Sequence, residues 1–178
     1  MDTQAASREI EDLLFALIPR RVGELRISVP VYCLMVKYLS GSEYGDTVPS
    51  LELPADSLRQ QIQKEKGNKA PYFLWSHFEL PHCPEVFTAT IHDPTLLAIV
   101  RLNPDLANRK LAQIVALRLN ALDWSQVTSV TDDFVVIAAD ETQEFGDTFG
   151  DIKASIGEER LANLRARKLI GSESWYHL

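Results

Sequence analysis

The chain has 178 residues, of which 46% are hydrophobic and 24% charged, which is the composition of an ordinary globular protein. Its 18 basic and 25 acidic residues leave a net charge of −7, which argues against non-specific binding to nucleic acid or to an anionic membrane, because both repel an acidic protein. A chain of this length buries roughly two-thirds of the surface that its unfolded form exposes, so we expect one domain with a full core over residues 1–178.

The N-terminal segment predicts a helix followed by a strand. Five aliphatic side chains are spaced as on one face of an amphipathic helix: Ile10, Leu13, Leu14, Leu17 and Ile18. Pro19 should end this helix, because proline removes a backbone donor and clashes with the preceding turn. Residues 25–39 are rich in Val, Ile, Tyr and Leu and predict a mostly buried strand, which either starts after Pro30 or lies at a sheet edge there.

The segments that follow predict a loop, a helix and a short strand. Residues 40–54 contain enough Gly, Ser and Pro to indicate a loop. Residues 55–65 predict a polar surface helix that stops at Gly67. The aromatic-rich segment 70–80 is ambiguous between helix and strand, and residues 86–91 alternate weakly, as a short strand does.

Two proline-containing pairs then indicate consecutive helices. The Asp-Pro pair at 93–94 combines an N-cap residue with a proline at the first helical position, and the Asn-Pro pair at 103–104 repeats this signal. We therefore expect one helix over residues 94–102 and a second, longer helix over residues 104–122.

The last part of the chain predicts a buried strand and a final helix. Residues 133–140 form an apolar run bounded by acids, which is the clearest strand pattern in the sequence. Ser155 and Glu158 have the spacing of a capping box, which would open a helix that runs through about Leu169. Because few strands alternate strictly with helices, we expect an α+β fold with a small mixed or antiparallel sheet and several helices packed on it.

Cysteine usage and hydropathy indicate a cytoplasmic protein. Two cysteines, Cys33 and Cys83, are too few for a disulfide framework. The first residues do not combine a basic segment with an apolar run, so we expect no signal peptide. No apolar run reaches the roughly 18 residues that a membrane span needs, so we expect no membrane association.

The excess acidity is concentrated in residues 131–151, which we call the acidic segment. It reads TDDFVVIAADETQEFGDTFGD and holds seven carboxylates and no Lys or Arg. The seven are Asp132, Asp133, Asp140, Glu141, Glu144, Asp147 and Asp151. The remaining 18 acidic residues match the 18 basic ones, so this segment accounts for the whole net charge. It fits a solvated strand end that resists pairing with other chains, a partner-binding face, or a metal site.

A metal-dependent hydrolase or phosphotransferase is the alternative function that this segment raises. Asp140 ends an apolar strand, where some phosphoryl-transfer enzymes place a nucleophilic or Mg²⁺-binding Asp, and Glu141 follows it directly. His82 or His92 would assist. The pattern is incomplete, because there is no second Asp two positions after Asp140 and no Gly-rich phosphate loop in the chain.

A second group of residues has the side chains that zinc prefers. These are His77, His82, Cys83, Glu85 and His92. Their spacing matches no closed Cys/His zinc pattern, and the group contains a single cysteine. A loop with half-exposed imidazoles explains them better than a zinc site does, because His is usually found at intermediate burial. We expect no bound cofactor and leave open whether these residues bind a metal.

Serine or cysteine catalysis and nucleic-acid binding find less support. The GSEYG stretch at 41–45 places its serine one position too early for a nucleophile elbow. Cys33 lies in an apolar strand, which would raise its pKa. The last helix has a basic outer face without interleaved aromatic residues, formed by Arg160, Arg165, Arg167 and Lys168. We therefore predict no nucleic-acid binding.

Four stretches of the chain carry a family resemblance. They are EYGDTVPSLEL (43–53), YFLWSHFELP (72–81), DWSQVTSVTDDFVVIAAD (123–140) and ASIGEERLANLRARKLI (154–170). Together they resemble uncharacterised bacterial domain-of-unknown-function proteins, some of which are grouped with immunity proteins of bacterial toxin systems. The resemblance covers most of the chain from about Val31 and carries no catalytic residues. It implies a protein that binds and blocks a partner.

We therefore predict an immunity-like, non-catalytic protein-binding module whose partner has a basic surface. Its acidic recognition face would consist of Asp132, Asp133, Glu141, Glu144, Phe145, Asp147 and Asp151. A third possibility is a structural subunit whose acidic segment pairs with the basic last helix of a neighbour. The sequence sets neither the partner nor the oligomeric state.

Overall fold

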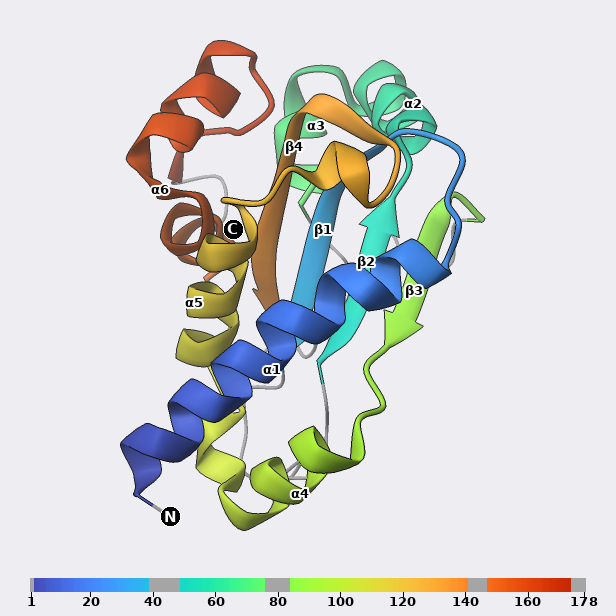
Figure 1. Ribbon diagram of the computed structural model, residues 1–178. Coiled ribbons are helices and arrows are strands. Elements are labelled where there is room, and N and C mark those ends of the chain that lie inside the picture. Colours follow the sequence, from blue (N-terminus) through green and yellow to red (C-terminus); the bar gives the residue numbers. More distant parts are fainter. Residues whose placement is uncertain (1, 39–48, 76–83, 141–146, 174–178) are drawn as a thin grey trace.

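The computed structural model describes residues 2–38, 49–75, 84–140 and 147–173, which form a four-stranded sheet with helices on both faces (Figure 1). This single-domain arrangement confirms the predicted α+β class, and of the two sheet types that the sequence allowed, mixed or antiparallel, the sheet is mixed. No helix in the described part of the chain is long and apolar enough to cross a membrane.

The sheet has the strand order β3-β2-β1-β4. Its strands are β1 (Val31–Tyr38), β2 (Ser50–Pro54), β3 (Val86–Thr90) and β4 (Val130–Asp140). β2 pairs antiparallel with both β1 and β3, whereas β1 and β4 are parallel neighbours in a register that sets Tyr38 opposite Asp140. The carboxyl ends of β1 and β4 therefore lie at the same end of the sheet.

The helices divide between the two faces of the sheet. They are α1 (Thr3–Glu24), α2 (Asp56–Lys66), α3 (Ala70–Phe73), α4 (Pro94–Leu102), α5 (Arg109–Leu119) and α6 (Thr148–Ala166). α1 and α5 pack on one face, and α1 lies diagonally across it (Figure 1). α4 lies beyond the ends of the strands and contributes to the same core. α2, α3 and α6 share a core with the other face.

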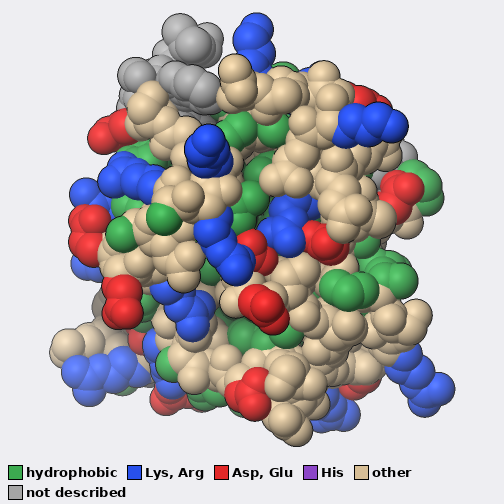
Figure 2. Space-filling model, turned by 90° about the horizontal axis from the view of Figure 1, so that it is seen from above, with side chains coloured by type: hydrophobic (Ala, Val, Ile, Leu, Met, Phe, Trp, Pro, Cys, Tyr) green, Lys and Arg blue, Asp and Glu red, His purple; other side chains and the backbone are tan. Residues whose placement is uncertain are grey.

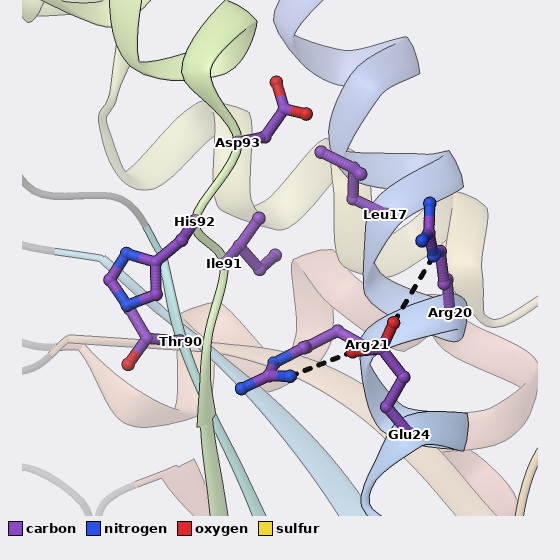
Figure 3. Close-up of a pocket in the computed structure, with 8 residues that line it drawn as sticks. All are labelled: Leu17, Arg20, Arg21, Glu24, Thr90, Ile91, His92 and Asp93. Carbon is purple, nitrogen blue, oxygen red and sulfur yellow. Dashed lines mark hydrogen bonds and ion pairs between the residues drawn. The ribbon is translucent and has the colours of Figure 1, made fainter.

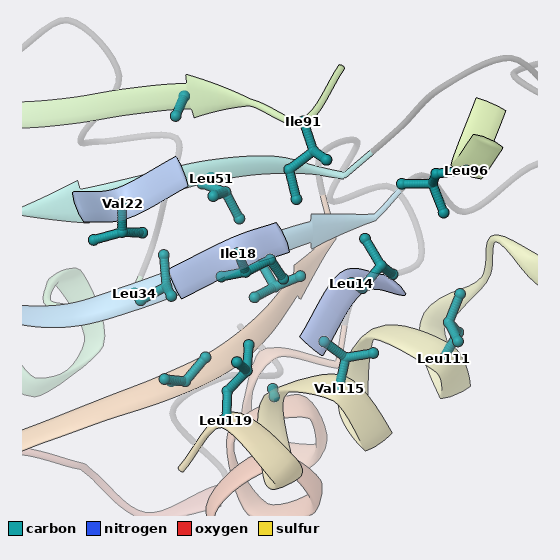
Figure 4. Packing of buried hydrophobic residues seen from close by; sticks show 14 of the residues in the cluster. Leu14, Ile18, Val22, Leu34, Leu51, Ile91, Leu96, Leu111, Val115 and Leu119 are labelled. Atoms are coloured by element: carbon teal, nitrogen blue, oxygen red, sulfur yellow. The ribbon is translucent and has the colours of Figure 1, made fainter. Parts of the chain in front are cut away.

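The first core is built on the aliphatic stripe of α1 (Figure 4). Leu14, Ile18 and Val22 recur every four residues, are at most 1% exposed, and pack against the sheet beside Leu34 and Leu51. Full burial of an aliphatic side chain stabilises the fold by about 1.5–3 kcal/mol, so this stripe is sufficient to hold α1 on the sheet.

The second core is fastened by two buried aromatic side chains that also donate hydrogen bonds. The Tyr32 hydroxyl on β1 donates to the carbonyl of Leu74 at 2.8 Å, and the Trp75 indole donates to the carbonyl of Leu169 at 2.8 Å. Because each polar tip finds an acceptor, the rings are buried without an unpaired donor. They tie β1 and the segment after α6 to the two residues that directly follow α3.

The edge of the sheet at β4 is closed by side chains instead of by another strand. The Asn120 side chain, just after α5, accepts from the Val136 N–H at 2.9 Å and donates to the Val136 carbonyl at 2.7 Å. The Ser155 hydroxyl oxygen accepts from the Ala138 N–H at 2.9 Å. Arg160 in turn donates to Asn120 Oδ1 at 2.6 Å. This part of the strand edge is thereby unavailable for pairing with another chain.

Several elements lie where the sequence predicts them. β1 begins directly after Pro30, α2 ends at Gly67, and β3, α4 and β4 match their predicted positions to within a few residues. The side chain of Asp93 caps α4 by accepting from the Leu96 N–H at 2.9 Å. In the ambiguous segment 70–80, the described residues form α3 and a turn after it.

The predicted end of the first helix at Pro19 is wrong, because α1 continues to Glu24. An internal proline costs a helix about 3 kcal/mol or more. Ile18 and Val22, on either side of Pro19, are both 0% exposed. Their burial offsets the loss of the hydrogen bond at Pro19.

The predicted loop at 40–54 is wrong at its end, where β2 forms. Leu51 and Leu53 of β2 point into the first core, and Glu52 points to the opposite face. There Glu52 accepts a hydrogen bond from Lys37 of β1 at 2.7 Å, and both side chains are buried. This ion pair offsets the cost of burying the Glu52 carboxylate. Because Lys37 lies on another strand, the sequence around Glu52 does not reveal the pair.

The predicted helix at 104–122 is too long at both ends. Residues 104–106 form a separate 3₁₀ turn, and Asn108 is the residue that caps α5, because its side chain accepts from the Leu111 N–H at 3.1 Å. The proline signal at 103–104 marked this turn instead of the start of the long helix.

The predicted capping box at Ser155 and Glu158 is also wrong. α6 begins at Thr148, with Asp147 as its N-cap, and Gly157 interrupts it with a φ of 74° and a ψ of 171°. That backbone conformation is essentially restricted to glycine, so Gly157 sets the kink. Ser155 lies before the kink and binds the edge of β4 instead of capping a helix.

Candidate functional site at the two ends of strand β4

The acidic segment spans β4 and the start of α6, so its carboxylates are distributed over two ends of the sheet. Asp132 and Asp133 lie near the beginning of β4, and Asp140 is its last residue. Asp147 and Asp151 lie at the N-terminus of α6, next to the carboxyl ends of β1 and β4. Each end has its own set of contacts.

At the carboxyl end, two elements place three donors around the carboxylate of Asp151, a residue that is 1% exposed. Tyr38, the last residue of β1, donates to Oδ2 at 2.8 Å. Arg109 and Gln113, one turn apart on α5, donate to Oδ1 at 2.6 and 2.8 Å. Asp151 lies in the first turn of α6, where the helix dipole also favours negative charge. We call these four residues the Asp151 cluster.

The protonation equilibria within the Asp151 cluster are shifted. Burial raises the pKa of Asp151 above its ordinary value, and the hydrogen bonds from Arg109, Tyr38 and Gln113 oppose this rise without cancelling it. Burial and the adjacent Asp151 carboxylate raise the pKa of Tyr38. Burial alone would lower the pKa of Arg109, but its bonds to Asp151 and Asp147 raise it. Tyr38 therefore keeps its phenolic proton and Arg109 keeps its positive charge, so both remain hydrogen-bond donors to Asp151.

Two further carboxylates flank this cluster. Asp147 is half-exposed and caps α6, because its Oδ1 accepts from the Gly150 N–H at 2.8 Å. Its Oδ2 lies 3.3 Å from Arg109 Nη2, so the same guanidinium serves Asp147 and Asp151. Asp140 is 4% exposed and stands opposite Tyr38 in the β1–β4 ladder. Together these contacts hold both ends of the connection from β4 to α6.

At the opposite end of β4, Asp133 is held by two arginines. Arg59 of α2 donates through Nη1 to both carboxylate oxygens at 2.9 Å, and Arg167, just after α6, lies 2.8 Å from Oδ2. The Thr131 hydroxyl donates to Oδ1 at 2.7 Å. Arg59 also lies over the ring of Tyr32, 5.4 Å from its centroid. Burial would raise the pKa of Asp133, but the bonds from Thr131 and Arg59 lower it.

The surface around the start of β4 is not uniformly acidic. Figure 2 views the molecule from this end and shows Lys and Arg side chains intermixed with Asp and Glu around a shallow hollow with hydrophobic atoms at its floor. Asp132 is exposed here and has no hydrogen bond or ion pair within the described part of the chain. The surface at this end therefore carries both charges.

The structure separates the residues of the predicted recognition face. Asp133 and Asp151 are almost completely buried and paired with arginines of the same chain, whereas Asp132 is exposed and Asp147 half-exposed. Glu141, Glu144 and Phe145 lie outside the described residues. No motif in the sequence marks Tyr38, Arg109 or Gln113, although the spacing of Arg109 and Gln113 indicates that both lie on one side of a helix.

The predicted metal-binding groups are only partly covered by the described residues. His77, His82, Cys83 and Glu141 lie outside them, and His92 is exposed between β3 and α4. Within residues 2–38, 49–75, 84–140 and 147–173, no three His, Cys, Asp or Glu side chains are grouped so that they could hold a metal ion. Burial raises the pKa of the Cys33 thiol well above its ordinary value, which disfavours the reactive thiolate.

Comparison with known proteins adds no relative. No family model, no curated protein and no solved structure matches the chain. The resemblance to bacterial proteins of unknown function therefore stays a prediction, and the function has to be inferred from the contacts described above.

Proposed function

We propose that this protein is a non-catalytic protein-binding module whose recognition surface is the acidic connection between β4 and α6. The observation that carries the proposal is the firm attachment of both ends of this connection. Asp140 ends β4 within the core, and Asp147 caps α6 and contacts Arg109. A connection attached at both ends presents its side chains at lower entropic cost than a free tail does.

The charge of the connection favours a basic partner. Glu141, Glu144 and Asp147 lie within seven residues, and no Lys or Arg occurs between 131 and 151. Carboxylates of one sign on one surface steer a basic partner and suppress acidic ones. Phe145 lies among them in the sequence and supplies the kind of aromatic anchor that dominates binding energy at interfaces.

The contacts redefine the recognition face. Asp133 and Asp151 are buried and paired with arginines of their own chain, so we assign them a structural role and omit them from the contact set. Asp147 also contacts Arg109 but stays in the set, because its side chain is 43% exposed. Asp132 lies on the end of β4 that Asp133 occupies, away from the connection, so we treat it as peripheral. The proposed contact residues are Glu141, Glu144, Phe145 and Asp147. An immunity-like role, in which the module blocks a basic toxin, belongs to this proposal.

A matched pair of baits tests the proposal. The test variant carries Glu141→Lys, Glu144→Lys and Phe145→Ala, and the control variant carries Glu65→Lys and Glu159→Lys, two exposed acids outside the acidic segment. Both are compared with the wild type in quantitative pull-downs from the native host, and the captured protein is then purified for direct affinity measurements at several salt concentrations.

We expect a basic partner that binds the wild type and the control, binds the test variant at least tenfold more weakly, and loses affinity as salt rises. A partner that binds the test variant and the wild type equally would contradict the proposed surface. A preparation that captures no partner and contains stoichiometric metal would support the metal-dependent alternative centred on Asp140 and Glu141.

A further inference from the structure

Strand β3 forms one edge of the sheet, and no further strand of the described chain lies beyond it (Figure 1). β3 pairs with β2 in a regular register over its whole length. Directly before β3, the carbonyl of Glu85 accepts a hydrogen bond from the Ala55 N–H at 2.8 Å, so the backbone groups of Glu85 face β2. Because backbone groups alternate in direction along an antiparallel strand, those of Val86, Thr88 and Thr90 face outward from this edge.

The outward backbone groups of β3 have no hydrogen-bond partner among the residues that the structure describes. Thr88, at the centre of the strand, is exposed. The opposite edge of the sheet differs, because the side chains of Asn120 and Ser155 bind the backbone of β4 there. β3 contains none of the charged residues, prolines or bulges that usually prevent an edge strand from pairing with another chain. This edge can therefore accept a further strand.

The last turns of α1 lie beside the end of β3 on one face of the sheet. Ile91, directly after β3, is 3% exposed and packs in the core under α1. His92 is exposed and points away from α1, whereas Arg21 of α1 reaches this end of β3, with its side chain 42% exposed and paired with Glu24 at 2.9 Å (Figure 3). Glu85 lies at the other end of β3 and makes no ion pair within the described residues. An arginine is therefore near one end of the strand and a carboxylate near the other.

We propose that two copies of this chain associate through their β3 edges, so that their sheets continue into one. The two strands would run antiparallel around a two-fold axis at Thr88, as a symmetric dimer requires. Thr88 would then lie opposite Thr88 of the second copy, and Val86 opposite Thr90 of the second copy. Each of these pairs joins residues whose backbone groups face outward, so each pair would exchange two backbone hydrogen bonds.

The side chains along the edge favour a second copy as the added strand. The facing pairs, Thr88 with Thr88 and Val86 with Thr90, are uncharged and β-branched, which suits neighbours across a ladder. Glu85 of each copy would lie opposite Ile91 of the other copy, on the face where the exposed part of Arg21 lies. The two-fold axis repeats this approach of opposite charges at both ends of the ladder.

The experiment follows the association of the full chain by sedimentation velocity from about 2 to about 500 µM, a range that brackets the affinity of a small interface. Thr88→Pro removes an outward N–H and leaves the β2 ladder intact, because Thr88 donates no bond to β2. Thr88→Lys keeps the backbone and sets two positive charges opposite each other, so it tests the same contact if the proline variant does not fold. Asn163→Lys is the matched control, because it adds the same charge at an exposed position on α6, beside the opposite edge.

We expect the wild type and Asn163→Lys to form dimers with a dissociation constant below about 100 µM, and each Thr88 variant to weaken dimerisation at least about tenfold. In the wild type, amide hydrogen exchange at Val86, Thr88 and Thr90 should slow as protein concentration rises, while exchange at Phe87 and Ala89, which face β2, should not change. The proposal is overturned if the wild type stays monomeric at about 500 µM, if its dimer is as stable with Thr88→Pro or Thr88→Lys, or if the outward amides exchange at the same rate at both ends of the concentration range.

Discussion

Asp133 and Asp151 belong to the same acidic segment and have contacts of the same kind, yet their carboxyl groups are shifted in opposite directions. Their side chains are only 7% and 2% exposed. Each accepts hydrogen bonds or ion pairs from three residues, at least one of them an arginine. The pKa of Asp133 is nevertheless lowered, whereas the pKa of Asp151 is raised.

Asp151 is the more deeply buried of the two, and the donors around the two carboxylates also differ in charge. Asp133 has two guanidinium groups, from Arg59 and Arg167, and one hydroxyl. Asp151 has a single guanidinium, from Arg109, and two neutral donors. At Asp151 the cost of burial outweighs the hydrogen bonds from Arg109, Tyr38 and Gln113, so its pKa is raised. At Asp133 the hydrogen bonds from Thr131 and Arg59 and the charge of Arg167 outweigh the cost of burial, so its pKa is lowered. A cluster of carboxylates in a sequence can therefore be internal structure instead of a surface.

The largest effect that we predict is on the Asp151 cluster. Asp151→Ala should lower the free energy of unfolding by about 3–5 kcal/mol, because it leaves Arg109, Tyr38 and Gln113 without their acceptor at a buried position. Urea denaturation followed by circular dichroism measures this loss. Asp147→Asn is the matched control, since Asn also caps helices, and it should cost less than about 1 kcal/mol. A loss below about 1 kcal/mol for Asp151→Ala would show that the cluster does not hold α5, α6 and β1 together.

The second prediction concerns pH and tests the opposite signs directly. The folded-state pKa of Asp133 is lowered from the ordinary aspartate pKa of 3.8. Its contribution to stability is therefore present above pH 3.8 and is lost as pH falls through the folded-state pKa. The folded-state pKa of Asp151 is raised, so its contribution to stability is present below pH 3.8 and is lost as pH rises through this folded-state pKa. The slopes of stability against pH from these two groups therefore have opposite signs.

Urea denaturation of the wild type, Asp133→Asn and Asp151→Asn between pH 2.5 and 7 separates the two contributions. The stability advantage of the wild type over Asp133→Asn should shrink below about pH 4, because a protonated Asp133 no longer pairs with its arginines. Relative to Asp151→Asn, the wild type should lose stability as pH rises above about 4. Carboxyl resonances in ¹³C NMR titrations report both groups directly. Slopes of the same sign would mean that the two sites do not differ as described.

Strand periodicity predicted part of this arrangement, and contacts between distant segments supplied the rest. The apolar run at 133–140 identified β4, and alternation along it separates Asp132 from Asp133. The partners of Asp133 lie on α2 and after α6, at Arg59 and Arg167, and no local pattern connects those positions. β2 was missed for the same reason, since Glu52 is buried only because Lys37 on β1 pairs with it.

The helix boundaries also show that local sequence patterns fail where a distant segment supplies the contact. The capping pattern at Asp93 identified α4 because the cap is a local contact within four residues. Ser155 also has the sequence of a cap, but the edge of β4 takes its hydroxyl group. A local rule therefore succeeds where the side chain has no competing distant partner, and it fails where the folded chain provides one.

The smallest predicted effect is at Asp132, the neighbour of Asp133 in the sequence. Asp132 is exposed and makes no hydrogen bond or ion pair within the described residues, so Asp132→Asn should change the free energy of unfolding by less than about 0.5 kcal/mol at pH 7. Asp133→Asn should cost several times more under the same conditions, because Arg59 and Arg167 lose a charged acceptor. Both are measured in one series of urea denaturations. Equal losses for the two variants would mean that charge density along the segment, and not burial with arginine partners, sets the contribution of these carboxylates to stability.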